Sequence, residues 1–222
     1  MTDSDKKRRD LLQARLQRDP FVYRRPRPDD PNQTDAVRVV TRTQQANNHA
    51  LRAEAVQQRL EAARNTGAEV VVPLDLGVHP DAGVSGEFVL QDSVNTFLTF
   101  RAVRPGPDGP IDAGTAIIRF RYIRASRFGL PNDEALGGHP LYERGLDYYA
   151  IGEVLNSTWA AEAERQNRVC FPDCPRWDTR HFVFTFHDSS FECLADDLTC
   201  ELTSKPHSEL VAELYAELAN DG

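Results

Sequence analysis

Hydrophobic positions follow two different periods along the chain, and the change falls near residue 68. Before it, four apolar residues recur at intervals of three and four, the spacing of one helical face: Ala53, Val56, Leu60 and Ala63. After it, residues 94–103 (VNTFLTFRAV) and 115–126 (TAIIRFRYIRAS) alternate between apolar and polar positions, which is typical of strands with one face on a core. The pattern predicts a helical segment followed by a domain that contains a sheet.

Three regions follow from this pattern. Residues 1–33 are rich in Arg and end in a proline-interrupted polar stretch, so we expect a flexible basic arm. Residues 34–67 begin with helix N-cap types and end at Gly67, a common helix stop, so they predict a helical extension of one helix or two. Its thin, alanine-rich apolar stripe favours docking on a partner or on another copy of the chain. Residues 68–222 form the folded domain.

The folded domain is expected to combine strands and helices. Residues 69–76 and 87–91 predict two strands, and the two alternating runs joined by a Gly/Pro loop predict an antiparallel hairpin. Residues 146–169 gather their apolar side chains on one helical face, so we expect a helix there, with Glu153 exposed on it. Residues 205–220 predict a closing amphipathic helix. This order indicates an α+β fold, an antiparallel sheet with helices packed on one face.

Composition narrows the possible functions. The net charge of −8 argues against a general nucleic-acid binder, which is normally basic. No apolar run is long enough for a membrane span, and the first residues lack the apolar core of a secretory signal, so we expect a cytoplasmic protein with reduced cysteines. No glycine-rich phosphate loop supports ATP or NAD binding, so we expect no cofactor.

The stretch HFVFTFHDSSFECLADD, residues 181–197, poses the sharpest chemical question. If Asp188 and Ser189 form a two-residue turn, Phe186 faces Phe191, and one side of the hairpin is uniformly apolar. A four-residue turn that closes Phe186 on Phe191 keeps the same pairing, whereas a three-residue turn mixes polar and apolar side chains. Because a slip of one residue exchanges the faces of a strand, we expect the register with the apolar side. It also places Phe184 opposite Cys193.

The reverse side of this hairpin then holds the candidate site. It carries His181 and Glu192, with His187 diagonal to Glu192. A histidine beside a carboxylate is the geometry of an oriented general base or a metal ligand, and equally of a surface ion pair. His139, in the loop GGHPL, can join this group, and Asp188 is a lesser candidate.

Two further sets of residues carry weaker signals. Arg119 and Arg121 share a strand face that can hold a phosphate or carboxylate, although ion pairing with acidic helix residues explains them equally well. The four cysteines do not have the spacing of a structural zinc site, so we expect no metal there. The serines of residues 156–158 (NST) and 188–190 (DSS) lack the strand–turn–helix context of a catalytic serine.

The leading hypothesis is a cytoplasmic, non-catalytic binding protein that meets a protein partner or its own copy through residues 34–67. A metal-dependent hydrolase or acid/base enzyme that uses His181, His187 and Glu192 is the alternative. A third hypothesis is phosphate or nucleotide binding at Arg119 and Arg121. The sequence patterns by themselves do not choose an enzyme over a binding protein.

Overall fold

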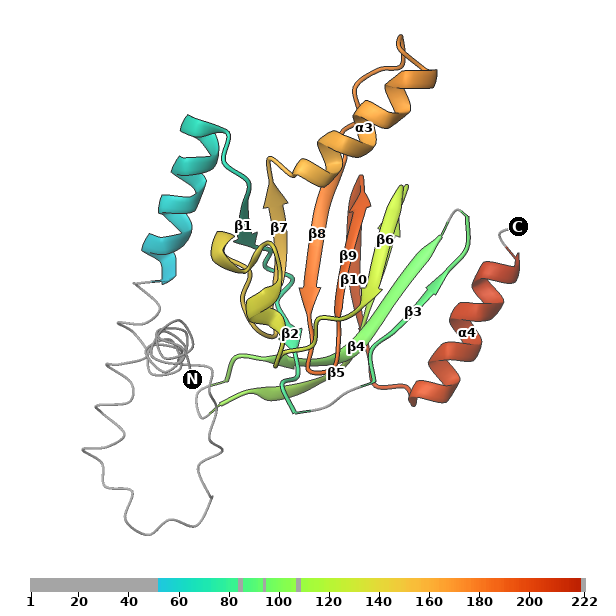
Figure 1. Ribbon diagram of the computed structural model, residues 1–222. Helices are drawn as coiled ribbons and strands as arrows, with labels where there is room; N and C mark the ends of the chain where they lie inside the picture. The colour runs from blue at the N-terminus through green and yellow to red at the C-terminus, as the bar shows by residue number, and fades with distance from the viewer. Residues whose placement is uncertain (1–51, 84–85, 94, 107–108, 221–222) are drawn as a thin grey trace, which may run out of the picture. The chain divides into compact units, whose positions relative to one another are not determined.

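The computed structural model describes residues 52–83, 86–93, 95–106 and 109–220 (Figure 1). The predicted arm, residues 1–33, and the extension up to residue 51 lie outside the described residues. Residues 52–66 are helical, and the N–H of Gly67 donates to the carbonyl oxygen of Ala63 at 3.1 Å. Gly67 adopts a φ of 68°, a left-handed conformation that glycine tolerates at a helix end, so the predicted stop is confirmed.

The chain divides into two compact units after Gln57, and all the strands described below belong to the second unit. One sheet has the strand order β1 (Val70–Pro73), β7 (Ile151–Leu155), β8 (Arg180–Thr185), β9 (Ser190–Ala195) and β6 (Ala125–Gly129). The other has the order β10 (Asp197–Thr203), β5 (Ile111–Arg121), β4 (Thr96–Arg104) and β2 (His79–Pro80), and β3 (Phe88–Gln91) also pairs with β4. All these strand pairs are antiparallel, and with the helices they confirm the predicted α+β class.

The main core lies between the two sheets. The second sheet contributes alternate residues of β4 and β5, namely Leu98, Phe100, Ala102, Ala116, Ile118 and Phe120. The first sheet contributes Ile151, Phe182, Phe184, Phe191, Cys193 and Ala195, and Phe186 at the hairpin turn joins them. Each fully buried aromatic or aliphatic side chain of this kind stabilises the fold by about 1.5–3 kcal/mol. The predicted inward face of the 181–197 hairpin is therefore confirmed.

The outer faces of the sheets are covered by different elements. Helix α4 (His207–Asn220) places Leu210 and Leu214 on Phe97 and Ile117 of the second sheet. The connection between β6 and β7 covers part of the first sheet with two short 3₁₀ helices, η1 (Leu136–Gly138) and η2 (Tyr142–Arg144). Helix α3 (Thr158–Cys170) follows β7. The polar part of the first sheet's outer face, which is buried beside η1 and the start of α3, holds the residues of chemical interest.

The single helix predicted over residues 146–169 is wrong. Residues 151–155 form β7, the strand between β1 and β8, and only residues 158–170 are helical. Ile151 lies in the main core and Val154 in the cluster on the opposite face of the sheet. A strand buried on both faces has no alternation, so its apolar spacing of three resembles a helix. Glu153 is on this strand and pairs with Arg180, with 2.6 Å between Oε2 and Nη2.

The register of the 181–197 hairpin differs from the predicted one by two residues. Phe184 lies opposite Phe191 and not opposite Cys193, and the N–H of Phe186 donates to the carbonyl oxygen of Ser189 at 2.9 Å. His187 and Asp188 therefore occupy the turn. A slip of two residues keeps every side chain on its predicted face but changes its neighbours.

Candidate functional site

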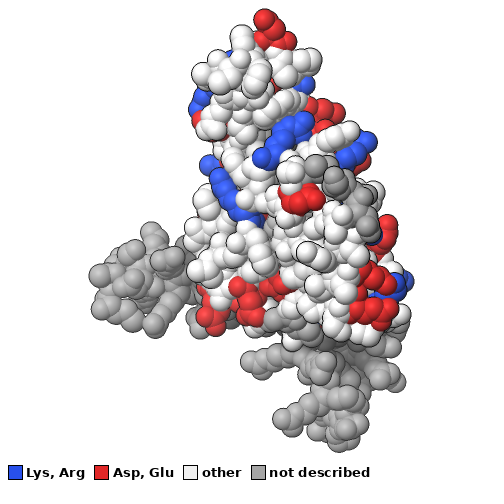
Figure 2. Space-filling view, turned by 90° about the vertical axis from the view of Figure 1, so that its right-hand side faces the viewer, with Lys and Arg blue, Asp and Glu red and all other residues white. Residues whose placement is uncertain are grey.

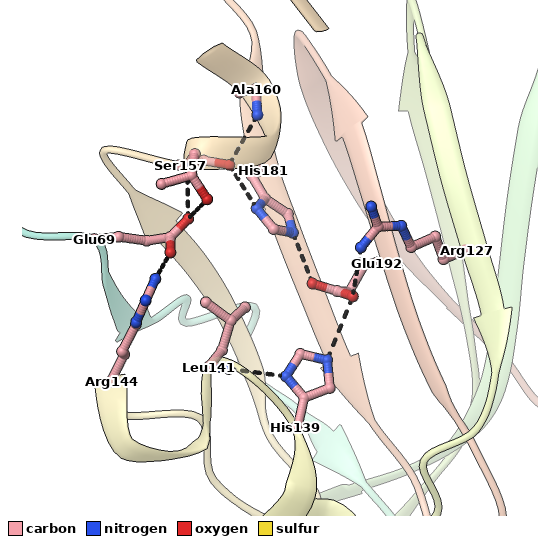
Figure 3. A network of polar contacts seen from close by, with 10 residues as sticks. Glu69, Arg127, His139, Leu141, Arg144, Ser157, Ala160, His181 and Glu192 are labelled. Carbon is pink, nitrogen blue, oxygen red and sulfur yellow. Dashed lines mark hydrogen bonds and ion pairs between the residues drawn. The ribbon is translucent and has the colours of Figure 1, made fainter. Parts of the chain in front are cut away.

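A carboxylate flanked by two imidazoles lies on the outer face of the first sheet (Figure 3). Glu192 of β9 is opposite Val183, which places it diagonal to His181 of β8. His181 Nε2 lies 3.0 Å from Glu192 Oε2, and His139 Nε2, from the residue after η1, lies 3.4 Å from Glu192 Oε1. The side chains of Glu192 and His181 are only 9% and 3% exposed, so the group is buried.

The remaining partners of the two rings fix the direction of each hydrogen bond. The N–H of Leu141 donates to His139 Nδ1 at 3.1 Å, so the proton of that ring is on Nε2 and points to Glu192. Ser157 Oγ lies 2.9 Å from His181 Nδ1 and accepts the N–H of Ala160 at 3.0 Å. Because the Glu192 carboxylate only accepts, the Nε2–H of His181 donates to it, and the hydroxyl of Ser157 then donates to Nδ1. Both oxygens of Glu192 and both nitrogens of each ring have partners.

Two opposing effects act on the pKa of Glu192. Burial raises it, while the hydrogen bonds from His139 and His181 lower it and prevail, so the pKa falls from 4.5 to about 2. Glu192 is thus an ionised acceptor at neutral pH. Burial of an unpaired carboxylate is costly, and here two donors offset that cost.

Ser157 lies in a setting that the sequence analysis excluded. It connects β7 to α3 directly after Asn156, whose φ is 53°, so residues 156–158 do have a strand–turn–helix context. With His181 and Glu192, the serine completes a chain of serine, histidine and carboxylate. The predicted absence of this context is wrong because β7 was interpreted as part of a helix.

Glu69 fills the position that an oxyanion would need beside this serine. In hydrolases with a serine at such a turn, the N–H of the following residue binds the developing oxyanion. Here the N–H and the hydroxyl of Thr158 donate to Glu69 Oε1 at 2.6 and 2.9 Å, and Arg144 pairs with the same carboxylate. A negative group already occupies the helix N-terminus. Ser157 therefore acts as the cap of α3, and its hydroxyl joins the helix to the sheet.

Arg127 and Trp159 form the rim of the buried group. The guanidinium of Arg127 lies 3.9 Å from the centre of the Trp159 ring, and its Nη1 lies 3.9 Å from Glu192 Oε1. The Trp159 ring packs edge-on against His181, with 5.1 Å between ring centres. These contacts join β6, β8, β9, the residue after η1 and the first turn of α3. We call His139, Ser157, His181 and Glu192, with this rim, the buried network.

A second histidine site lies at the hairpin turn. His187 is 47% exposed, its Nδ1 lies 2.8 Å from Asp133 Oδ2, and the hydroxyl of Tyr149 donates to the same carboxylate oxygen. Asp133 Oδ1 is buried and has no hydrogen-bond partner among the described residues. His187 Nε2 is 4.0 Å from Asp188 Oδ1, too far for a hydrogen bond. We call Asp133 and His187 the exposed dyad.

Hydrogen bonding shifts the pKa of both members of the exposed dyad. The hydrogen bond and charge of Asp133 raise the pKa of His187 above 6.5. Partial burial raises the pKa of Asp133, but the hydrogen bonds from Tyr149 and His187 outweigh it, and the pKa is lowered. Tyr149 holds its hydroxyl there with a φ of 50°, an uncommon conformation for a residue with a side chain.

The structure divides the predicted site between these two places. His181, Glu192 and His139 come together, whereas His187 and Asp188 lie at the turn with Asp133. Ser157 was not predicted as a site residue, although a serine two positions before the helix formers of residues 159–164 is an N-cap signal. No local pattern indicates Asp133, which lies 54 positions before His187.

The arginine site predicted on β5 is already engaged by carboxylates. Arg119 pairs with Glu217 of α4, its Nε lies 3.6 Å from Glu201 Oε1, and its guanidinium lies over the Phe97 ring. Arg121 lies over the Tyr122 ring. An anion at Arg119 would have to displace two carboxylates, so this geometry favours the ion-pair interpretation. Basic and acidic side chains occur in small, separate groups on the face shown in Figure 2.

All four cysteines are free thiols. Within the described ranges, no group of three or more His, Cys, Asp or Glu side chains has an arrangement suited to a metal ion. The two imidazoles of the buried network approach different oxygens of Glu192, which suits hydrogen bonding.

No protein-family model, no curated protein and no solved structure matches this chain. Among the described helices, none is both long and apolar enough to cross a membrane.

Proposed function

We propose that the protein is a non-catalytic binding protein that engages a protein partner through α3. The observation that carries this proposal is that none of the thirteen residues of α3 is buried. Figure 1 shows α3 extending beyond the end of the first sheet. At its far end, Val169 and Phe171, the residue after the helix, are 80% and 62% exposed. Apolar side chains gathered on a projecting element are typical of an interaction surface.

The stability of α3 comes from its ends and its surface pairs. An isolated helix of this length is marginal in water, and α3 has no apolar stripe in the core. Pairs between Arg168 and Glu164 at 3.1 Å, and between Arg165 and Glu162, support its exposed turns. The first turn is fixed by Ser157 and by Glu69. A helix kept ordered without burial is suited to present a surface.

The buried network supports this interpretation. Its carboxylate, rings and serine satisfy one another, and Glu69 fills the helix N-terminus where a substrate oxygen would bind. The arrangement serves to hold the base of α3 against the sheet at a fixed angle. Positioning of the binding helix is the role that we propose for His181 and Glu192.

Affinity capture with matched variants tests the proposal. Three forms of the full-length protein serve as baits in lysate of the native cell. They are the wild type, the α3 variant with Val169→Ser and Phe171→Ser, and a control with Ile111→Ser and Leu130→Ser. The control removes two apolar side chains that are 54% and 85% exposed elsewhere. We expect quantitative mass spectrometry to show a protein retained by wild type and control and reduced at least tenfold with the α3 variant. Identical protein sets for all three baits would contradict the proposal.

Two earlier expectations remain predictions. Association through residues 34–67 involves a segment that is described only from residue 52, where it is helical up to residue 66. Cytoplasmic location is part of the same proposal, and fractionation of the native cell tests it.

The exposed dyad favours a second candidate function, acid/base catalysis. The Nδ1 of His187 is held by Asp133 and its Nε2 faces outward, which is how a carboxylate orients a general base. A panel of chromogenic esters and phosphoesters tests this role, with His187→Gln and Asp133→Asn as variants. His207→Gln, at an exposed histidine of α4, is the control. Turnover that both dyad variants lose and the control keeps would support it, and turnover that they leave unchanged would exclude it.

A further inference from the structure

We propose that β10 pairs with β10 of a second copy of the chain, antiparallel and across a two-fold axis. β10 lies at one end of the second sheet and pairs with β5 on one side only. A strand in this position presents unpaired backbone N–H and C=O groups along its open edge. This contact is separate from the binding surface proposed for α3.

The strands at the edges of the two sheets differ in how well they are protected against pairing with a strand of another molecule. β1 contains Pro73, β2 contains Pro80, and β6 ends at Gly129 with five residues in all. β3 has only four residues. β10 has seven, contains no Pro, Gly or Lys, and keeps an uninterrupted register with β5 from Asp197 to Thr203. Prolines, lysines, bulges and short length are the usual defences of an edge, so β10 is the open one among the described strands.

The sequence of β10 is complementary to itself in one register. With the axis at Cys200, Leu198 faces Leu202 of the second copy, and Asp197 faces Thr203. Thr199 then faces Glu201, and the Thr199 hydroxyl can donate a hydrogen bond to the Glu201 carboxylate. Opposite apolar pairs and polar pairs stabilise adjacent strands, and no two carboxylates meet.

Other registers are less favourable. An axis at Thr199 places Asp197 opposite Glu201, and an axis at Glu201 places two copies of that carboxylate opposite each other, which is destabilising. An axis between two residues pairs leucines with charged or polar side chains, because it combines opposite faces of the strand. The pairing centred on Cys200 is therefore the register that we propose.

Exposure and charge along β10 agree with this pairing. Leu198 and Cys200 pack against the main core, whereas Leu202 is 39% exposed. The second copy covers Leu202 with its own Leu198. Asp197 already pairs with Arg180, with 3.0 Å between Oδ1 and Nη1, so its charge at the edge is offset. The result is a continuous sheet of ten strands, five from each copy.

Light scattering coupled to size exclusion, on the full-length protein over a dilution series, tests the pairing. We expect a dimer for wild type and for the control Tyr215→Lys, which adds a lysine at a 65% exposed aromatic of α4. Leu202→Lys adds a charge to the edge and is expected to give a monomer with an unchanged circular dichroism spectrum. A monomeric wild type at every concentration, or a dimer that survives Leu202→Lys, would overturn the proposal.

Cross-linking tests the register independently. Cα atoms of directly opposite residues in an antiparallel pair lie about 4.5–5.5 Å apart, which suits a disulfide. In a protein with Cys170→Ser and Cys174→Ser, mild oxidation is expected to link two copies through Cys200, and additional Cys200→Ser is expected to abolish the link. A link through Cys193, or a dimer without any link, would overturn the register. The α3 variant should keep the dimer, so the two proposals fail separately.

Discussion

Two histidines of the same hairpin, six positions apart, have opposite environments. His181 is 3% exposed and both its ring nitrogens have partners, whereas His187 is 47% exposed and its Nε2 has no hydrogen bond to a described residue. Each is held by a carboxylate on one nitrogen. This difference indicates that the hydrogen-bond partner of the second ring nitrogen decides the role of such a histidine. In the buried network that partner is Ser157, which makes the pair a fixed link, and in the exposed dyad the second nitrogen has only Asp188, at 4.0 Å, among the described residues.

The two carboxylates differ in the same way. Glu192 uses both oxygens to accept one donor each, while Asp133 accepts two donors on Oδ2 and has none on Oδ1 within the part of the chain that the structure describes. The buried network therefore contributes mainly to stability, and the exposed dyad keeps an open position. Variants at the two sites separate these two contributions.

The largest expected effect is that of Glu192→Gln. A shift of the pKa from 4.5 to about 2 corresponds to about 3 kcal/mol of stabilisation, and the amide also turns an N–H₂ group toward one of the two donors. We expect urea unfolding to show a loss of about 2–4 kcal/mol in the free energy of unfolding. Asp133→Asn, in the exposed dyad, serves as the comparison and should lose less than half as much. Equal losses would remove the distinction between the two sites.

A fall in pH should destabilise the protein by protonating the same carboxylate, Glu192. Because the pKa of Glu192 is lowered in the folded state, its stabilisation is complete above pH 4.5 and is lost as the pH falls toward about 2. The free energy of unfolding of wild type should therefore fall more steeply between pH 4.5 and about 2 than that of Glu192→Gln. Urea titrations at several pH values measure both slopes, and parallel slopes would contradict the assignment.

Ser157→Ala tests the link between the buried network and α3. The variant loses the cap of the helix and the donor to His181, so we expect a loss of about 1–2 kcal/mol. Amide hydrogen exchange should increase over residues 158–162, while β8 and β9 stay protected. Thr66→Ala, which removes a hydroxyl bonded to Ala62 at another helix end, is the control. Unchanged exchange in α3 would show that Ser157 does not anchor the helix.

The smallest effect is expected at the exposed dyad. The pKa of His187 is raised, so the pair stabilises the fold fully below pH 6.5, and this contribution is lost as the pH rises through the folded-state pKa. Solvent screening keeps the effect on stability small. An NMR titration should give a pKa for His187 above 6.5 in wild type and a lower one in Asp133→Asn. The same pKa in both proteins would show that Asp133 does not hold the ring.

Much of the candidate site follows from local pattern. The alternation of Phe182, Phe184 and Phe186 predicts which way the hairpin faces, and it places His181 and Glu192 together on the outer side. The turn residues did not predict the register, since a slip of two preserves both faces. β6 and β10 were not predicted either. β6 (ASRFG) has no alternation to indicate a strand, whereas residues 197–203 (DLTCELT) do alternate between polar and apolar positions, and this signal was missed.

The sequence by itself determined the antiparallel α+β class, the inward phenylalanines, and the helix end at Gly67, since each depends on periodicity or on the backbone freedom of one residue. Only the tertiary structure decided that residues 151–155 are a strand, because a segment buried on both faces carries no distinctive period. Tertiary structure also brought His139 to Glu192 and Asp133 to His187. These contacts join residues 53 and 54 positions apart, and such pairing depends on how the β6–β7 connection packs on the sheet rather than on any local preference.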